Sequence, residues 1–98
     1  MKYTIFLLPE AEKEKLKLDK VYQEEIDEVY SYIEETGLVN VNINSLGNKI
    51  YEIKTEKTRS IFKYQKGQII IVGVVFLKKS QKTPLKIIKL AQKRLKEI

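Results

Sequence analysis

The order of apolar and polar residues divides the chain into a strand, two helices, an irregular stretch, three strands and a last helix. Residues 2–8 form an apolar run with β-branched and aromatic members, so we expect a strand that ends at Pro9. Pro9 suits the first turn of a helix, and Glu10 and Glu12 favour a helix N-terminus. This pattern predicts a short helix over residues 9–17.

Apolar residues at helical spacing predict a second, longer helix over residues 19–36, with Asp19 placed to cap its start and Gly37 its end. The opposite face of this helix is rich in glutamate and aspartate, which predicts an acidic outer surface. We interpret its tyrosines as packing residues rather than stacking platforms. Residues 37–47 alternate aliphatic residues with asparagines, and we interpret them as a loop with some extended character, the alternative being a short edge strand.

Residues 49–56 and 58–65 alternate in polarity, which predicts two strands joined by a tight turn at Glu56-Lys57. Lys66-Gly67 supplies the next turn. Residues 68–77 are almost wholly apolar, which predicts a central strand covered on both faces. Gly73 within this strand indicates a bulge or a close approach of another element.

The last element is a basic helix predicted over residues 84–97, with Thr83 at its N-cap and Pro84 in its first turn. Its lysines recur at spacings of three and four, and they form either a binding surface or an ordinary solvated face. The fold class is therefore α+β, in one domain over residues 1–98. We expect a small, mostly antiparallel sheet with an N-terminal helical hairpin on one face and a C-terminal helix.

Composition removes several kinds of chemistry. The 98 residues include no cysteine and no histidine, which excludes disulfides, thiolate metal sites and histidine-dependent catalytic triads. We expect no cofactor and no metal. No apolar run approaches the roughly 18 residues of a membrane span, so we expect a cytoplasmic protein without a membrane partner.

Charge is distributed unevenly along the chain. Residues 1–46 hold five lysines and ten acids, a net −5, whereas residues 47–98 hold fourteen cations and three acids, a net +11. Such a basic half indicates a polyanionic partner, nucleic acid first, although it also fits a well-solvated surface.

Strand alternation gathers part of this charge on one sheet face. Because side chains alternate along a strand, Glu52, Lys54, Arg59 and Lys63 should share the face opposite the helices. A further basic cluster follows the apolar strand, at Lys78, Lys79, Gln81 and Lys82. Together they predict an exposed, concave basic surface suited to phosphates, the alternative being a wet sheet face decorated with charge.

Residues 46–98 resemble the RelE/ParE toxin superfamily, and most closely its phage-derived HigB-like branch. The resemblance rests on Y-E-I-K at 51–54, R-S-I-F-K-Y at 59–64, K-G-Q at 66–68 and F-L-K-K-S-Q-K-T-P at 76–84. The last string is the most specific of the four. Family members often carry histidines before its phenylalanine, where this chain has Gly73, Val74 and Val75.

The resemblance implies a RelE-like fold and a type II toxin that cleaves mRNA on the ribosome, neutralised by a cognate helix-turn-helix antitoxin. The family chemistry is attack of a ribose 2′-hydroxyl on the adjacent phosphate. It implies Arg59 as the group that stabilises developing charge, with Lys54 at a position where the family usually has arginine. Glu52 matches the family glutamate and would orient these cations or act as a base.

The resemblance also implies RNA binding by the basic residues around this catalytic group. These RNA-binding candidates are Lys63, Lys78, Lys79, Gln81 and Lys82. Two alternatives remain open from the sequence: a ParE-like toxin that poisons DNA gyrase, and a non-catalytic RNA- or partner-binding domain on the same scaffold.

Overall fold

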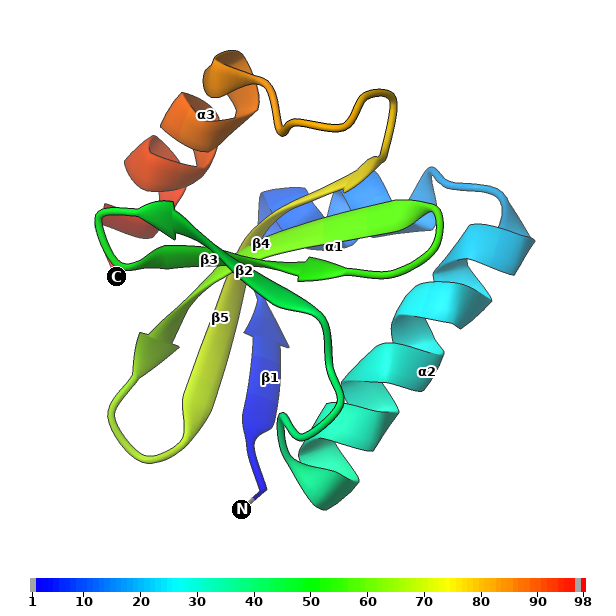
Figure 1. Ribbon diagram of the computed structural model, residues 1–98, viewed down its shortest axis with the longest axis vertical. Coiled ribbons are helices and arrows are strands. Elements are labelled where there is room, and N and C mark those ends of the chain that lie inside the picture. The colour runs from blue at the N-terminus through cyan, green and yellow to red at the C-terminus, as the bar shows by residue number, and fades with distance from the viewer. Residues whose placement is uncertain (1, 97) are drawn as a thin grey trace.

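The computed structural model describes residues 2–96 and 98, and shows an α+β arrangement of one sheet with helices packed against it (Figure 1). This confirms the predicted fold class. Residue 97, which we placed in the last helix, lies outside the described residues. The elements in chain order are β1 (Thr4–Leu7), α1 (Pro9–Leu16), α2 (Lys20–Thr36), β2 (Ile43–Gly47), β3 (Ile50–Lys54), β4 (Thr58–Gln65), β5 (Ile69–Leu77) and α3 (Leu85–Lys96).

The sheet has five strands in the order β1-β5-β4-β3-β2. β1 runs parallel to β5, and every other neighbouring pair is antiparallel, as the turn signals between the last strands predicted. β5 has a neighbour on each edge and is largely buried, which agrees with its unbroken apolar sequence. At the outer edge of β1, the Ile5 amide donates to the Glu34 carboxylate of α2 at 2.9 Å, so this edge amide has a partner.

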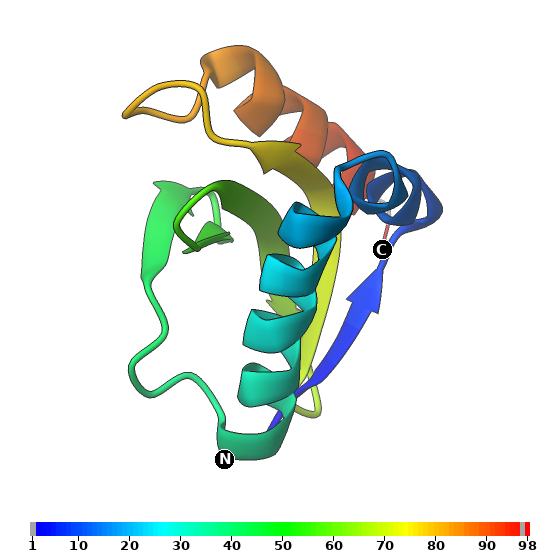
Figure 2. The ribbon, with the colours of Figure 1, turned by 90° about the vertical axis from the view of Figure 1, so that its right-hand side faces the viewer.

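One face of the sheet is covered by the two N-terminal helices. Ala11 of α1 and Ile26, Tyr30 and Ile33 of α2 are buried against this face, at the helical spacing that the sequence predicted. Figures 1 and 2 show α1 crossing the sheet while α2 runs along its side, so the two helices cross steeply.

The opposite face is also covered, and this corrects the expectation of an open basic surface. Ala91 and Leu95 of α3 pack on Ile61, Ile71 and Val74 in a second core cluster. Glu52 and Arg59, which lie on this face, are only 2% and 9% exposed. Strand alternation correctly placed these two residues on the same sheet face, but it carries no information on which element covers that face.

Residues 43–47 form strand β2 rather than the expected loop. Asn44 is in register with Glu52 and Ser45 with Tyr51 of β3, while the Asn42 carbonyl accepts the Lys54 amide at 2.8 Å. An edge strand pairs on one side only, so its polar side chains can reach solvent without disturbing the sheet. That freedom is why an asparagine-rich sequence can still form a strand here.

Gly73 forms both a bulge and a close approach, the two possibilities that its place in β5 raised. Val72 pairs with Phe62 and Val74 with Ile61, so Gly73 has no partner on β4. A Cβ atom on Gly73 would lie 2.8 Å from the Leu95 Cγ. The missing side chain therefore lets α3 settle directly on β5.

The bulge is tied to both neighbouring helices. The Val75 amide donates to Glu14 Oε1 of α1 at 3.1 Å, and Arg94 Nη1 of α3 donates to the Gly73 carbonyl at 2.8 Å. Arg94 also forms an ion pair with Glu14 at 3.0 Å. Backbone groups freed by the irregular register thus find side-chain partners, which fixes the direction of the second half of β5.

None of the helices in the described part of the chain has the length and apolarity that a bilayer span requires.

Candidate functional site

A pocket of about 410 Å³ lies beneath the segment that connects β5 to α3, which arches over the sheet in Figures 1 and 2. We call it the exit pocket. Its walls come from the end of α1, the start of β4, the end of β5 and the start of α3. The lining residues are Glu14, Lys17, Leu18, Arg59, residues 75–84 and Ile87.

Arg59 is the cation in this lining that is nearly buried. Its Nη1 atom donates to the carbonyls of Thr55 and Thr58, at 2.6 and 2.7 Å, which fixes the guanidinium group. No carboxylate pairs with Arg59 among the residues that the structure describes. A nearly buried charge without a counter-ion is costly, so its retention points to an anionic ligand.

The remaining donor nitrogens of Arg59 make no hydrogen bond to the described residues. An arginine carries five N–H groups, and the hydrogen bonds of Arg59 in the described chain use Nη1 alone. No buried side-chain nitrogen or oxygen among the described residues lacks a partner. The unused Arg59 nitrogens are therefore accessible, and the pocket that Arg59 lines gives them access to a ligand.

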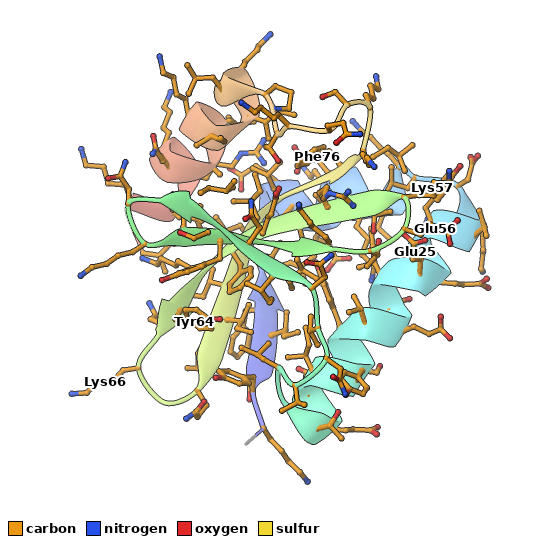
Figure 3. All side chains as sticks on the ribbon, in the orientation of Figure 1. Glu25, Glu56, Lys57, Tyr64, Lys66 and Phe76 are labelled. Atoms are coloured by element: carbon orange, nitrogen blue, oxygen red, sulfur yellow. The ribbon has the colours of Figure 1, made fainter. Side chains whose placement is uncertain are left out.

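The turn between β3 and β4 holds Arg59 in place and is itself held by α2. Thr55 donates its hydroxyl to the Glu25 carboxylate, and the Lys57 amide donates to the same oxygen at 3.2 Å. Figure 3 shows Glu25 close to the labelled turn residues Glu56 and Lys57. Burial raises the pKa of the Glu25 carboxyl, whereas hydrogen bonds from Thr55, Thr58 and the Lys57 amide lower it. The hydrogen bonds together outweigh burial, so the pKa of Glu25 lies below its usual value.

Glu52 lies beneath the segment that roofs the pocket. Thr83 donates its hydroxyl to Glu52 Oε2 at 2.5 Å, and Asn44 donates its amide to Oε1 at 3.2 Å. No hydrogen bond or ion pair joins Glu52 to Lys54 or Arg59 in the described chain. These contacts make Glu52 an anchor for the roof of the exit pocket.

The predicted basic residues after β5 belong to the roof of the exit pocket. Lys78, Lys79, Gln81 and Lys82 are all exposed and line it. Two hydrogen bonds shape the segment that carries them: the Lys78 amide donates to the Lys57 carbonyl at 2.8 Å, and Ser80 Oγ donates to the Lys82 carbonyl at 2.7 Å. The structure therefore brings these four residues and Arg59 together.

Lys54 and Lys63 lie elsewhere than expected. Lys54 is the register partner of Arg59 on β3 but does not line the exit pocket. Lys63 lies near the other end of β4, where its Nζ atom donates to the carbonyls of Leu95 and Ile98, at 2.9 and 2.7 Å. The single concave surface that we expected is thus divided between two ends of one strand.

Sequence reasoning missed the contribution of α1. Glu14, Lys17 and Leu18 line the exit pocket, yet they precede Arg59 by more than 40 residues and match no motif. Only the packing of α1 across β5 brings them there. No group of three or more acidic, histidine or cysteine side chains in the described residues could hold a metal ion.

Arg59 is nearly buried, has no ion-pair partner among the described residues and lies in a pocket with a lysine-rich roof. The protein is therefore a small basic protein with a pocket suited to anions. The chain belongs to the family described as phage derived protein Gp49-like, whose model matches residues 13–96. No curated protein matches the chain in sequence.

Two solved structures share the fold. The toxin–antitoxin complex RelBE2 from Mycobacterium tuberculosis matches with a TM-score of 0.66 and 11% identity, covering 80% of this chain and 100% of the matched chain. The RelB–RelE antitoxin–toxin complex from Methanococcus jannaschii matches with a TM-score of 0.62 and 12% identity, covering 74% and 88%. At these identities the likeness establishes the RelE-like fold.

Proposed function

We propose that this protein is the toxin of a type II toxin–antitoxin system, and that it inhibits translation by cleaving mRNA on the ribosome. Its family, its RelE-like fold and the titles of the two similar structures support a toxin that pairs with an antitoxin. The F-L-K-K-S-Q-K-T-P string supports the HigB-like subtype, and hence a helix-turn-helix antitoxin and a cytoplasmic site of action.

The observation that carries this proposal is Arg59. Arg59 is 9% exposed as a residue, makes no ion pair in the described chain and lines a pocket roofed by Lys78, Lys79 and Lys82. A fixed cation in a partly dry site stabilises charge that develops during a reaction better than a mobile surface cation does. A phosphate that bears extra negative charge in the transition state fits this environment.

The proposed reaction transfers a phosphoryl group within the RNA. The ribose 2′-oxygen forms a bond to the adjacent phosphorus while the bond to the 5′-oxygen of the next nucleotide breaks. The products are a 2′,3′-cyclic phosphate and a 5′-hydroxyl. The proton lost by the 2′-hydroxyl is balanced by one gained by the leaving 5′-oxygen. Because the chain has no histidine, these transfers fall to a carboxylate, a lysine, a tyrosine or water.

All the candidate residues except Lys63, which binds the Leu95 and Ile98 carbonyls, have a part in this proposal. Arg59 stabilises the developing charge, and Lys54, its neighbour across the strand pair, adds positive potential. Glu52 positions the roof through Thr83. The flanking phosphates are bound by Lys78, Lys79, Gln81 and Lys82.

Substitution of Arg59 tests the site. Arg59→Gln should lower the rate of mRNA cleavage by roughly 10²–10³-fold, the effect of removing one donor that stabilises a transition state. Arg59→Lys should fall between Gln and the wild type, because it keeps the charge but loses the planar fork. Primer extension on mRNA from induced cells measures cleavage, and growth after induction reports toxicity, which Arg59→Ala should relieve.

The matched control is Lys20→Ala, which removes an exposed cation at the start of α2 that does not line the exit pocket. Thermal unfolding of each purified variant separates loss of activity from loss of fold. Full toxicity of a folded Arg59→Gln variant would rule out the assigned site. Intact mRNA together with DNA-damage signalling in wild-type cells would favour gyrase poisoning instead.

A second candidate function is RNA binding without cleavage on the same scaffold. It is favoured by the absence of histidine, since Gly73, Val74 and Val75 stand where relatives often carry it. If the protein binds RNA without cleaving it, we expect translation arrest with uncleaved mRNA. The same primer extension experiment distinguishes this function from endoribonuclease activity.

A further inference from the structure

Among the described residues that line the exit pocket, Phe76 is the one aromatic side chain, and it lies directly beside Arg59. The two residues are register partners on the neighbouring strands β5 and β4. Side chains of register partners point to the same face of a sheet, with their Cβ atoms roughly 4.5–5.5 Å apart. Figure 3 shows Phe76 close to the segment that roofs the pocket. An aromatic ring thus lies next to the cation that lacks an ion-pair partner in the described chain.

Phe76 and Arg59 belong to a row of side chains at the edge of the area that α3 covers. Lys54 of β3 is the register partner of Arg59, so the row runs across three strands. Ile61 and Val74, two residues along β4 and β5, are fully or almost fully buried in the core cluster that α3 completes. Phe76 is only half-buried. Its ring therefore belongs both to the edge of this core and to the wall of the exit pocket.

The exit pocket combines apolar walls with a cationic rim. Leu18, Phe76 and Ile87 supply apolar surface, while Lys17 and the lysines of the roof supply positive charge. Among the described lining residues, Glu14 carries the one carboxylate, and it is already engaged in an ion pair. The volume of about 410 Å³ lies within the range of roughly 300–1,000 Å³ that is usual for small-ligand sites. The pocket therefore fits a ligand that carries an apolar group and a negative charge close together.

A nucleotide has this combination of groups. Its base is a flat ring system that stacks on aromatic side chains, and its phosphate accepts the paired hydrogen bonds that a guanidinium donates. Because Phe76 and Arg59 lie side by side on one sheet face, a base and a phosphate joined by a single ribose can contact both residues. The lysines of the roof add contacts for the phosphates on either side.

We propose that the exit pocket binds one nucleotide of single-stranded RNA, with its base stacked on the Phe76 ring and its phosphate bound by Arg59. That this nucleotide flanks the cleaved bond rests on the proposed function. Binding does not require cleavage and is tested separately. Because every base has a π-face, stacking on Phe76 contributes affinity for any base rather than a preference for one sequence.

Binding is measured with and without a base. The probe is a short fluorescent oligouridylate with 2′-O-methyl riboses, which cannot be cleaved by 2′-attack, and its partner is an abasic oligomer of the same length and charge. Fluorescence anisotropy gives the Kd of each. Phe76→Leu should weaken binding of the oligouridylate by about 5-fold or more, the lower end of the effect of losing one stacked base. The same variant should bind the abasic oligomer as the wild type does, and Phe76→Tyr, which keeps the ring, should bind both as the wild type does.

Two further variants serve as controls. Phe6→Leu removes an exposed ring on β1 that does not line the exit pocket, so the Kd of both oligomers should stay unchanged. Arg59→Gln should weaken binding of both oligomers by the same factor, because Arg59 contacts the phosphate and not the base. Thermal unfolding of each purified variant shows whether it is folded.

A second measurement uses the wild-type protein alone. Stacking of a base places the ring protons of Phe76 in the ring current of that base. In NMR spectra these protons should therefore shift upfield on addition of the oligouridylate but not of the abasic oligomer. Phe62 is 0% exposed, and its ring protons should stay in place with either oligomer.

Equal loss of oligouridylate and abasic binding in Phe76→Leu, or unshifted Phe76 protons in the wild type, would overturn the proposal. If neither oligomer binds, whereas an acidic, leucine-containing peptide binds and loses affinity in Phe76→Leu, the pocket belongs to a protein segment and the proposal fails. Base-dependent binding by a wild-type protein that leaves mRNA intact would support the nucleotide site and refute the endoribonuclease. Cleavage of mRNA by Phe76→Leu at the wild-type rate would support the endoribonuclease and refute the role of Phe76.

Discussion

Gly73 shows how much one residue can decide in this fold. The space where a side chain at Gly73 would lie is filled by Leu95 of α3. The Leu95 Cγ, Cδ2 and Cδ1 atoms would lie 2.8, 3.0 and 3.2 Å from a Cβ atom added to Gly73. Leu95 is 2% exposed and has little room to move. The absence of a side chain at Gly73 therefore sets how closely α3 approaches the sheet.

We expect Gly73→Ala to destabilise the protein by about 1–3 kcal/mol, the usual effect of overpacking a core. Leu95→Val should relieve the clash, so the double variant should be more stable than the sum of the single changes predicts, by at least about 0.5 kcal/mol. Denaturant unfolding of the wild type, both single variants and the double variant measures this coupling. If the stability changes of the two single variants simply add in the double variant, the contact between residue 73 and Leu95 does not determine the stability loss.

At the scale of elements, the β3–β4 turn couples the acidic helix α2 to the exit pocket. Glu25 accepts hydrogen bonds from Thr55 and the Lys57 amide, and the Thr55 hydroxyl in turn accepts the Thr58 amide at 3.0 Å. The carbonyls of the same turn receive the Arg59 guanidinium. A carboxylate on a helix thus positions a cation that it does not touch.

We expect Glu25→Gln to loosen this turn, because an amide is a weaker acceptor than a carboxylate. The Thr58 amide should exchange its hydrogen faster in this variant, whereas Glu28→Gln, which changes an exposed acid on the same helix, should leave exchange unchanged. Hydrogen exchange followed by NMR measures both. Equal exchange in the two variants would argue against a positioning role for Glu25.

The Glu25 contribution has a defined pH dependence. Its pKa is lowered in the folded protein from the ordinary value of 4.5, so the folded state favours the ionised form. Stability from Glu25 is therefore present above pH 4.5 and is lost as the pH falls through the folded pKa. The wild type should lose stability more steeply than Glu25→Gln over this acid range.

At the scale of the whole molecule, charge is separated between the N-terminal and C-terminal halves. The outer face of α2 carries exposed acids, whereas the exit pocket is built mainly from the half with a net charge of +11. Such a separation orients the molecule in an electric field and attracts a negatively charged partner to one side.

We expect the antitoxin to cover the basic side with an acidic or apolar segment. If the proposed function holds, hydrogen exchange of the protein with and without its cognate antitoxin should show protection in β4 and in residues 78–84. Raising the salt concentration should slow association, because steering by charge is screened. Protection confined to α2 would contradict this arrangement.

The limits of sequence reasoning are clear from particular residues. The period of the apolar residues predicted α2 and β4, and the turn residues predicted where the strands join, since these signals are local. The asparagine-rich residues 43–47 were misjudged because an edge strand needs only one partner, and that partner is distant in sequence. Strand alternation placed Glu52 and Arg59 on one face, but their burial depends on α3 and on the roof of the exit pocket.

The sequence by itself determined every element except β2, the fold class and the basic character of the second half, because periodicity and composition act over short distances along the chain. Tertiary structure alone decided that Arg59 is nearly buried without a carboxylate partner among the described residues, that Glu52 anchors Thr83, and that Lys63 holds α3. It also divided the one expected surface, since Arg59 lines the exit pocket whereas Lys63 binds the Leu95 and Ile98 carbonyls at the other end of β4. The physical reason is that burial and pairing depend on which distant elements pack together.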